Sequence, residues 1–99
     1  MSSVDLATLT LGDFTPHMDE GFTLSAPSGT LMLTLKETRA LGMAKREGGA
    51  FGLVFVSPKG PFLPQAMYPV EHPALGTLEI FLVPIGPLHG GNAYEAIFT

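Results

Sequence analysis

The chain has 99 residues, which is enough for one small domain with one hydrophobic core and excludes a second domain. Charged residues make up only 14% of it, against about 25% in typical soluble domains, and the net charge is −4. Cysteine is absent, which excludes a disulfide scaffold and thiolate zinc sites and agrees with a reducing compartment. We expect a single domain over residues 1–99, with an N-terminal segment at 1–20 and a β domain at 21–99.

The basic residues are too mixed with acidic ones to favour nucleic acid as a partner. Four of the five lie between residues 36 and 46, where Glu37 interrupts them and Glu47 follows, so they would neutralise few phosphates. The N-terminus lacks the basic start and continuous apolar run of a signal peptide. The longest apolar run, at 80–85, contains Pro84 and is far shorter than the roughly 20 residues that span a bilayer. We therefore expect a cytoplasmic protein without a membrane partner.

The N-terminal segment predicts two short helical turns, at about 10–14 and 16–19. Thr10 can cap the first turn, and Asp13 lies near the positive end of its dipole. Pro16 suits the first position of the second turn, where its missing amide hydrogen costs nothing. The side chains expected to face the core are Leu11, Phe14 and Met18.

From residue 21 onward, apolar residues alternate with polar ones, as expected of strands with one buried face. The polar stretch at 37–49 is predicted to hold the end of the second strand and a loop or short helical turn, and 84–92 is predicted as a loop. The predicted strands are 22–26, 30–36, 51–56, 65–72, 77–83 and 93–98. The fold class is therefore mainly β, a small antiparallel barrel or sandwich of about six strands behind a short helical N-terminal segment.

Two of these strands have distinctive positions in the predicted sheet. The third, at 51–56, is apolar on both faces, so it is expected to be central or covered. The fourth contains Pro69, which cannot donate a ladder hydrogen bond, so it is expected at an edge or at a bulge.

The pair Glu71 and His72 resembles a metal or acid/base site, but strand geometry argues against it. Successive side chains of a strand point to opposite faces, so the two residues cannot ligate one metal or share one proton. Pro73 and Gly76 favour a tight hairpin turn. We interpret this stretch as a strand end with a histidine that caps the turn, and expect His72→Ala to have at most a modest effect on stability.

Other catalytic and metal patterns are weaker. A cupin-like arrangement would need histidines one residue apart, whereas only His72 and Glu79 could contribute to its first motif, and His89 with Asn92 has the wrong spacing for its second. A metal site needs about three convergent ligands. The serines lack a glycine-flanked nucleophile elbow, and Lys59 lacks the glycines of a phosphate loop. The sequence predicts no catalytic residue, no metal site and no cofactor.

The unusual feature of the sequence is its low content of charged residues, which leaves few of them to cover the surface of the folded domain. In the fifth strand the inward stripe already contains three aliphatic residues, yet Phe81 and Val83 lie on the other stripe. Met32 and Met67 lie on the outward stripes of their strands. Methionine and aromatic residues are common in contact surfaces, so we expect an interface with a protein partner or a second copy at these four residues.

The C-terminal half contains LPQAMY, EHPALG, FLVPIG and YEAIF, and the N-terminal half contains LTLGDFTPH. These stretches resemble a family of small bacterial proteins of unknown function with the pattern L-P-Q-x-x-Y, E-H-P-x-L-G, L-F-L-V-P-x-G and Y-E-A-x-F. Pro69 and Thr99 depart from that pattern. The resemblance implies an accessory structural part that accompanies phage-tail-like or tail-collar-like proteins. Matching positions are Pro64, Gln65, Tyr68, Glu71, His72, Pro73, Leu75, Gly76, Phe81, Leu82, Val83, Pro84, Gly86, Tyr94, Glu95 and Phe98.

Three functions are compatible with these observations. The first is a non-enzymatic structural or interaction module that self-associates or docks on a larger assembly. The second is a β-barrel that binds a small apolar ligand in its mouth, with Tyr68, His72 and Tyr94 as polar contacts. The third is a cupin-like metal-dependent enzyme.

Overall fold

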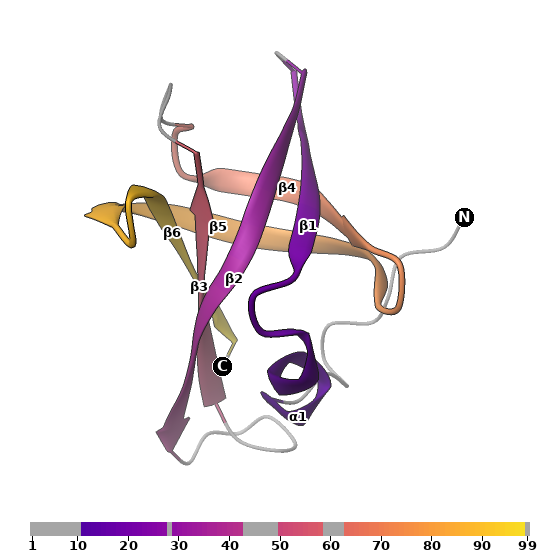
Figure 1. Ribbon diagram of the computed structural model, residues 1–99, viewed down its shortest axis with the longest axis vertical. Helices are drawn as coiled ribbons and strands as arrows, with labels where there is room; N and C mark the ends of the chain where they lie inside the picture. The colour runs from indigo at the N-terminus through magenta and orange to yellow at the C-terminus, as the bar shows by residue number, and fades with distance from the viewer. Residues whose placement is uncertain (1–10, 28, 43–49, 59–62, 99) are drawn as a thin grey trace.

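The computed structural model describes residues 11–27, 29–42, 50–58 and 63–98 (Figure 1). Six antiparallel strands form one closed barrel in the order β1, β2, β3, β6, β5, β4. The elements are helix α1 (Leu11–Phe14), the 3-10 helix η2 (Thr15–His17) and strands β1 (Gly21–Ala26), β2 (Gly29–Gly42), β3 (Ala50–Ser57), β4 (Ala66–His72), β5 (Gly76–Leu88) and β6 (Gly91–Phe98). The predicted mainly β fold with about six strands and a short helical start is confirmed, as a barrel rather than a sandwich. Neither described helix is long and apolar enough to cross a membrane.

Two strands are longer than their clear alternation indicates: β2 ends within the stretch 37–49, which is predicted to hold its end, and β5 runs into the stretch predicted as a loop at 84–92. β2 continues to Gly42 with register shifts against β3 after Leu35 and after Ala40. β5 continues to Leu88, with a shift against β6 near Gly86, whose φ of 102° suits glycine. A bulge absorbs an extra residue while pairing resumes beyond it, so these polar and proline-containing stretches stay in the barrel.

β3 is the covered strand that its apolar sequence predicts. All eight of its residues are buried, and it pairs with β2 on one side and β6 on the other. Its inward side chains join the main core, whereas Val54 and Val56 form a second small cluster with Ala93 on the outer face. The expectation of a central or covered strand is therefore confirmed.

β4 is not an edge strand, and its register against β5 shows no bulge, which corrects the expectation drawn from Pro69. It pairs with β5 along its whole length, and it closes the barrel by pairing with β1. That closing ladder contains only two residue pairs, Leu24 with Val70 and Thr23 with Glu71. This β1–β4 ladder, the seam of the barrel, ends beside Pro69, which has no amide hydrogen to donate. The proline therefore shortens the seam, but the barrel remains closed.

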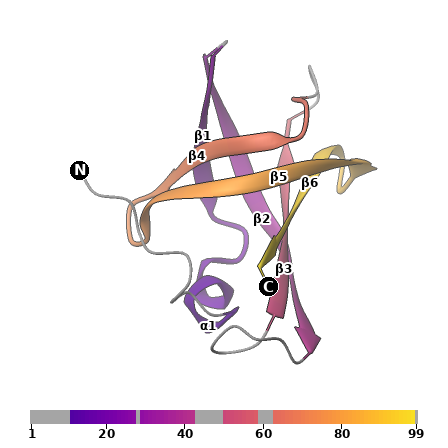
Figure 2. The ribbon, with the colours of Figure 1, turned by 180° about the vertical axis from the view of Figure 1, so that it is seen from behind.

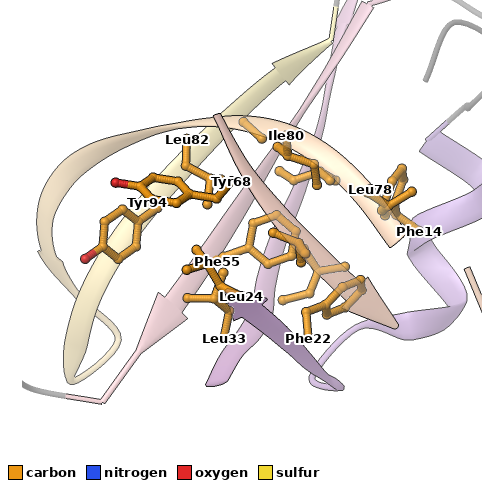
Figure 3. Close-up of a cluster of buried hydrophobic side chains, with 14 of the residues drawn as sticks. Phe14, Phe22, Leu24, Leu33, Phe55, Tyr68, Leu78, Ile80, Leu82 and Tyr94 are labelled. Carbon is orange, nitrogen blue, oxygen red and sulfur yellow. The ribbon is translucent and has the colours of Figure 1, made fainter. Parts of the chain in front are cut away.

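The interior of the barrel is filled by side chains (Figure 3). Phe22 meets Phe55 edge to face, with ring centroids 5.2 Å apart, and aliphatic residues from all six strands complete the core. Helix α1 lies at one end of the barrel and the tip of the β1–β2 hairpin lies at the other (Figures 1 and 2). Phe14 is fully buried, as predicted, and Leu11 and Met18 pack against the core as partly buried residues. We call the end next to α1 the plug end and the opposite end the hairpin end.

Candidate functional site

A carboxylate shared by two imidazoles lies at the plug end, where the N-terminal segment meets the barrel. Glu20 Oε1 is 2.8 Å from His17 Nδ1 and 2.7 Å from His72 Nε2. His17 ends η2, Glu20 immediately precedes β1, and His72 is the last residue of β4. The cluster therefore ties the N-terminal segment to the strand that closes the barrel.

Backbone contacts hold Glu20 in place. Asp19 adopts a left-handed φ of 66°, which aspartate tolerates better than most residues, and its N–H donates to the Leu35 carbonyl at 2.8 Å. The Leu35 N–H in turn donates to the Glu20 carbonyl at 3.2 Å. The Asp19 carboxylate also accepts a hydrogen bond from Lys36 at 3.0 Å. The turn before β1 is thus anchored to β2, which fixes the position from which the Glu20 side chain reaches His72.

His72 is held by contacts on every side of its ring. It is buried while Glu71 is exposed, so the expectation that the two residues face opposite ways is confirmed. Its Nδ1 accepts a hydrogen bond from the Ala74 N–H at 3.0 Å, which confirms that it caps the turn. Its ring lies 4.6 Å from that of Phe22 and 4.4 Å from that of His17. Because Nδ1 acts as an acceptor, Nε2 carries the proton and donates it to Glu20.

These hydrogen bonds keep Glu20 charged. The bond from His72, followed by the bond from His17, lowers the pKa of the Glu20 carboxyl below its usual value, because both bonds favour the ionised form. At neutral pH the cluster is therefore a carboxylate between two imidazole nitrogens.

A second histidine and carboxylate cluster lies on the outside of the barrel. Glu37 accepts a hydrogen bond from His89 at 2.7 Å and another from Arg39 at 2.6 Å, and Arg39 also lies 3.5 Å from Glu95. The bonds from His89 and then from Arg39 lower the pKa of Glu37, and the Glu37 carboxylate raises the pKa of Arg39. This cluster has one imidazole and one guanidinium on its carboxylate, so it differs from the plug-end cluster in chemistry.

The predicted ligand contacts do not converge on one place. Tyr68 donates a hydrogen bond to the Pro64 carbonyl at 2.6 Å, and the Tyr94 hydroxyl accepts one from the Leu63 N–H at 2.9 Å. Figure 3 shows both hydroxyls on the side of the core away from Phe14. The two tyrosines therefore hold the segment before β4 at the hairpin end, whereas His72 belongs to the plug-end cluster.

The residues weighed for a cupin-like site are also separated. His72 is buried inside the barrel and Glu79 is exposed on its outside, so they cannot face one ion. His89 has a left-handed φ of 53° in the turn between β5 and β6 and bonds to Glu37, while Asn92 is buried in β6. Of the loop predicted at 84–92, only His89 and Gly90 form the turn, because β5 runs to Leu88 and β6 begins at Gly91.

Two of the four predicted interface residues are neighbours on the surface. Met67 and Phe81 are direct partners in the β4–β5 ladder, and their exposed fractions are 58% and 48%. Beside them, an open groove of about 700 Å³ is lined by Met67, Pro64, Pro69 and six other residues. Val83 is half-buried. Met32, which is 53% exposed, is not part of this pair: it lies on β2, where its side chain packs next to Gly21 of β1.

Sequence reasoning missed the plug-end cluster because its members are far apart in the chain. Glu20 and His72 are separated by 52 residues, and only the closure of the barrel brings them together. The local signal was the spacing of His17 and Glu20 in a turn, which places both side chains on one side of it.

The fold and this site define a small closed six-stranded antiparallel barrel whose seam is bridged by histidine and carboxylate side chains. The family described as a domain of unknown function, DUF6916, matches residues 9–98, and the chain belongs to this family. No curated protein and no solved structure matches the chain.

Proposed function

We propose that this protein is a non-enzymatic structural and interaction module that self-associates through the outer face of β4 and β5. The observation that carries the proposal is the cross-strand pair of Met67 and Phe81 beside an apolar groove. Large apolar side chains that are adjacent and exposed are typical of contact surfaces.

A closed barrel restricts how such a module can bind. Every described strand has a neighbour on both sides, although β1 and β4 share only two residue pairs, so many backbone groups of the described strands are already paired within the barrel. The interior is filled by side chains, which disfavours the alternative of a ligand-binding barrel. We therefore expect contacts to use mainly side chains on the outer surface.

The chemistry of this face favours a second copy as the partner. It contains a protruding ring, Phe81, and a hollow that Met67 helps to line. A two-fold contact needs a surface that is complementary to itself, and a ring beside a hollow meets that requirement. Glu71 and Glu79 are exposed on the same two strands, so they would form an acidic rim. Salt should strengthen self-association, because it screens the repulsion between two such rims.

The test is the solution mass of two matched variants, measured by size-exclusion chromatography with light scattering. We expect Phe81→Glu to reduce the mass to that of one chain, because a charge would be buried without a partner in the contact. Met32→Glu is the matched control, since Met32 is equally exposed but lies outside the proposed face. It should keep the wild-type mass.

Three results would contradict the proposal. A wild-type chain that is monomeric at high concentration and high salt would exclude self-association. Equal loss of mass in both variants would place the contact elsewhere, and unfolding of Phe81→Glu by circular dichroism would place Phe81 in the monomer's own core.

Docking on a larger, phage-tail-like assembly in the cytoplasm is the second form of the proposal, supported only by the sequence resemblance. A folded monomer that binds such a partner through Met67 and Phe81, more weakly in high salt, would favour it.

A further inference from the structure

We propose that His17, Glu20 and His72 bind one zinc ion through Nδ1, Oε1 and Nε2. The three ligand atoms all lie within 4.8 Å of one another, and two separate segments of the chain supply them. The proposal departs from our sequence-based expectation of no metal site, which considered Glu71 and Glu79 as partners of His72 but not Glu20.

The distances in the cluster are close to those that zinc requires. Zinc bonds of about 2.0–2.1 Å in a tetrahedral site place neighbouring ligand atoms about 3.3 Å apart. Glu20 Oε1 lies 2.8 Å from one imidazole nitrogen and 2.7 Å from the other. The two distances from Glu20 need to open by only about half an ångström, and the flexible, half-exposed Glu20 side chain can provide that movement. The two imidazole nitrogens, which lie within 4.8 Å of each other, need to reach the same separation of about 3.3 Å.

The donor set favours zinc over the hard cations. Imidazole nitrogens suit zinc and its neighbours in the transition series, whereas calcium and magnesium prefer oxygen ligands throughout. Three protein ligands leave a fourth position for water. A hollow of about 320 Å³, lined by His72, Thr23 and Thr77 among others, lies on one side of His72, and Glu20 is itself exposed, so water can approach the cluster.

Zinc binding changes the hydrogen bonding of His72. The proton on Nε2 must leave that nitrogen and move to Nδ1, because a neutral imidazole coordinates through its unprotonated nitrogen. Nδ1 then no longer accepts the bond from the Ala74 N–H. Two N–H groups then face each other without an acceptor, which lowers the affinity by roughly ten- to a hundredfold, and coordination by two imidazoles and a carboxylate must offset this loss. The Ala74 amide therefore reports on occupancy of the site.

The second cluster supplies a matched control. His89 also lies 2.7 Å from a carboxylate, that of Glu37, but its other neighbour is the Arg39 guanidinium. A guanidinium cannot ligate a cation and repels it. We expect no zinc at this cluster, although it has the same imidazole and carboxylate pair.

The experiment is calorimetric titration of zinc into the full chain, purified without a histidine tag and stripped with chelator. We expect one ion per chain, with a large shift of the Ala74 amide resonance at saturation. His17→Ala and Glu20→Gln should each weaken binding by about a hundredfold or more, since loss of a ligand costs more than loss of its supporting partner. His89→Ala should bind like the wild type. Cobalt, titrated in place of zinc, should give the visible absorption of a four-coordinate ion.

The choice of variants keeps the result interpretable. In Glu20→Gln the side-chain amide oxygen can still accept the hydrogen bond from His72 Nε2, so this variant should keep the fold while losing the anionic ligand. Absence of stoichiometric binding to the wild type would overturn the proposal and leave the cluster a hydrogen-bonded clasp. Undiminished binding by both His17→Ala and Glu20→Gln would overturn it as well. Titration of Phe81→Glu separates this result from self-association, because Phe81 is not part of the cluster.

Discussion

The two ends of the barrel are closed by different interactions. At the plug end, Phe14 of α1 is fully buried and packs against Phe51 and Phe98, with ring centroids 5.8 and 5.9 Å away. At the hairpin end, the hydroxyls of Tyr68 and Tyr94 hold the backbone at 63–64 by single hydrogen bonds. Leu63 and Ala66 also pack against the core at the hairpin end, but only as partly buried residues. The two ends therefore differ in the size of the buried side chain and in the polar contacts that accompany it.

Because of this difference, we expect side chains at the plug end to determine global stability and those at the hairpin end to determine the order of one segment. Burial of a large ring contributes several times the net free energy of one hydrogen bond, because a hydrogen bond within the protein replaces one to water. We expect changes at the plug end to affect global unfolding. Changes at the hairpin end should act mainly on the segment that the tyrosines hold, so the comparison can be tested one end at a time.

The largest effect is expected at the plug end. Phe14→Ala should lower the free energy of unfolding by about 3–5 kcal/mol, because it removes a fully buried ring and leaves a cavity against Phe51 and Phe98. Urea denaturation measures this change, and Phe81→Ala, which truncates a ring that is 48% exposed, is the matched control. A loss at Phe14 no greater than at Phe81 would show that α1 does not stabilise the barrel.

Much of this fold could be predicted from the sequence because the alternation of apolar residues reports directly on burial. The inward stripe of β5, Leu78, Ile80 and Leu82, is buried as predicted, and Phe81 between them is exposed. The end of β2 could be placed only within 37–49, and the continuation of β5 to Leu88 was not predicted, since bulges interrupt the alternation there. Closure of the barrel could not be predicted from local sequence patterns either, because it depends on a seam of two residue pairs between β1 and β4.

The candidate site was predicted only in part. Strand periodicity correctly separated Glu71 from His72, but it carries no information on which distant side chain meets a buried histidine. The structure supplies Glu20 as that partner and packs Phe22 and His17 against the ring. His72→Ala should therefore cost more than the modest loss expected from one hydrogen bond, because the substitution also removes buried ring contacts.

A smaller effect is expected at the hairpin end. Tyr94→Phe removes the hydroxyl that accepts the Leu63 N–H and should lower the free energy of unfolding by about 0.5–1.5 kcal/mol. Hydrogen exchange at the Leu63 amide should accelerate by more than the global loss explains, because that amide loses its acceptor. Tyr68→Phe, whose hydroxyl donates to the Pro64 carbonyl, is the companion variant and should leave the Leu63 amide protected. Equal exchange in both variants would mean that the two bonds act as one unit.

The smallest effect is expected outside both closures, at the cluster of Glu37, His89 and Arg39. The pKa of Glu37 is lowered in the folded chain, chiefly by the bond from His89. A group with a lowered folded pKa stabilises the fold above its unfolded pKa, and that contribution is lost as the pH falls through the folded value. Glu37→Gln should therefore cost less than about 1 kcal/mol at pH 7, as for other surface pairs, and the cost should shrink as the pH falls below 4.5.

The control for this pH dependence is Glu95→Gln, because Glu95 faces the same guanidinium at a longer distance, 3.5 Å, and makes no bond to His89. Its cost at pH 7 should be smaller than that of Glu37→Gln. Urea denaturation of wild type and both variants at a series of pH values gives the two differences directly. High salt should reduce both, since these groups are partly exposed and their attraction is screened. A cost at Glu37 that grows as the pH falls would have the wrong sign for a carboxylate stabilised in its ionised form. The contact between Glu37 of β2 and His89 in the β5–β6 turn would then depend on the shape of the Glu37 side chain and not on its charge.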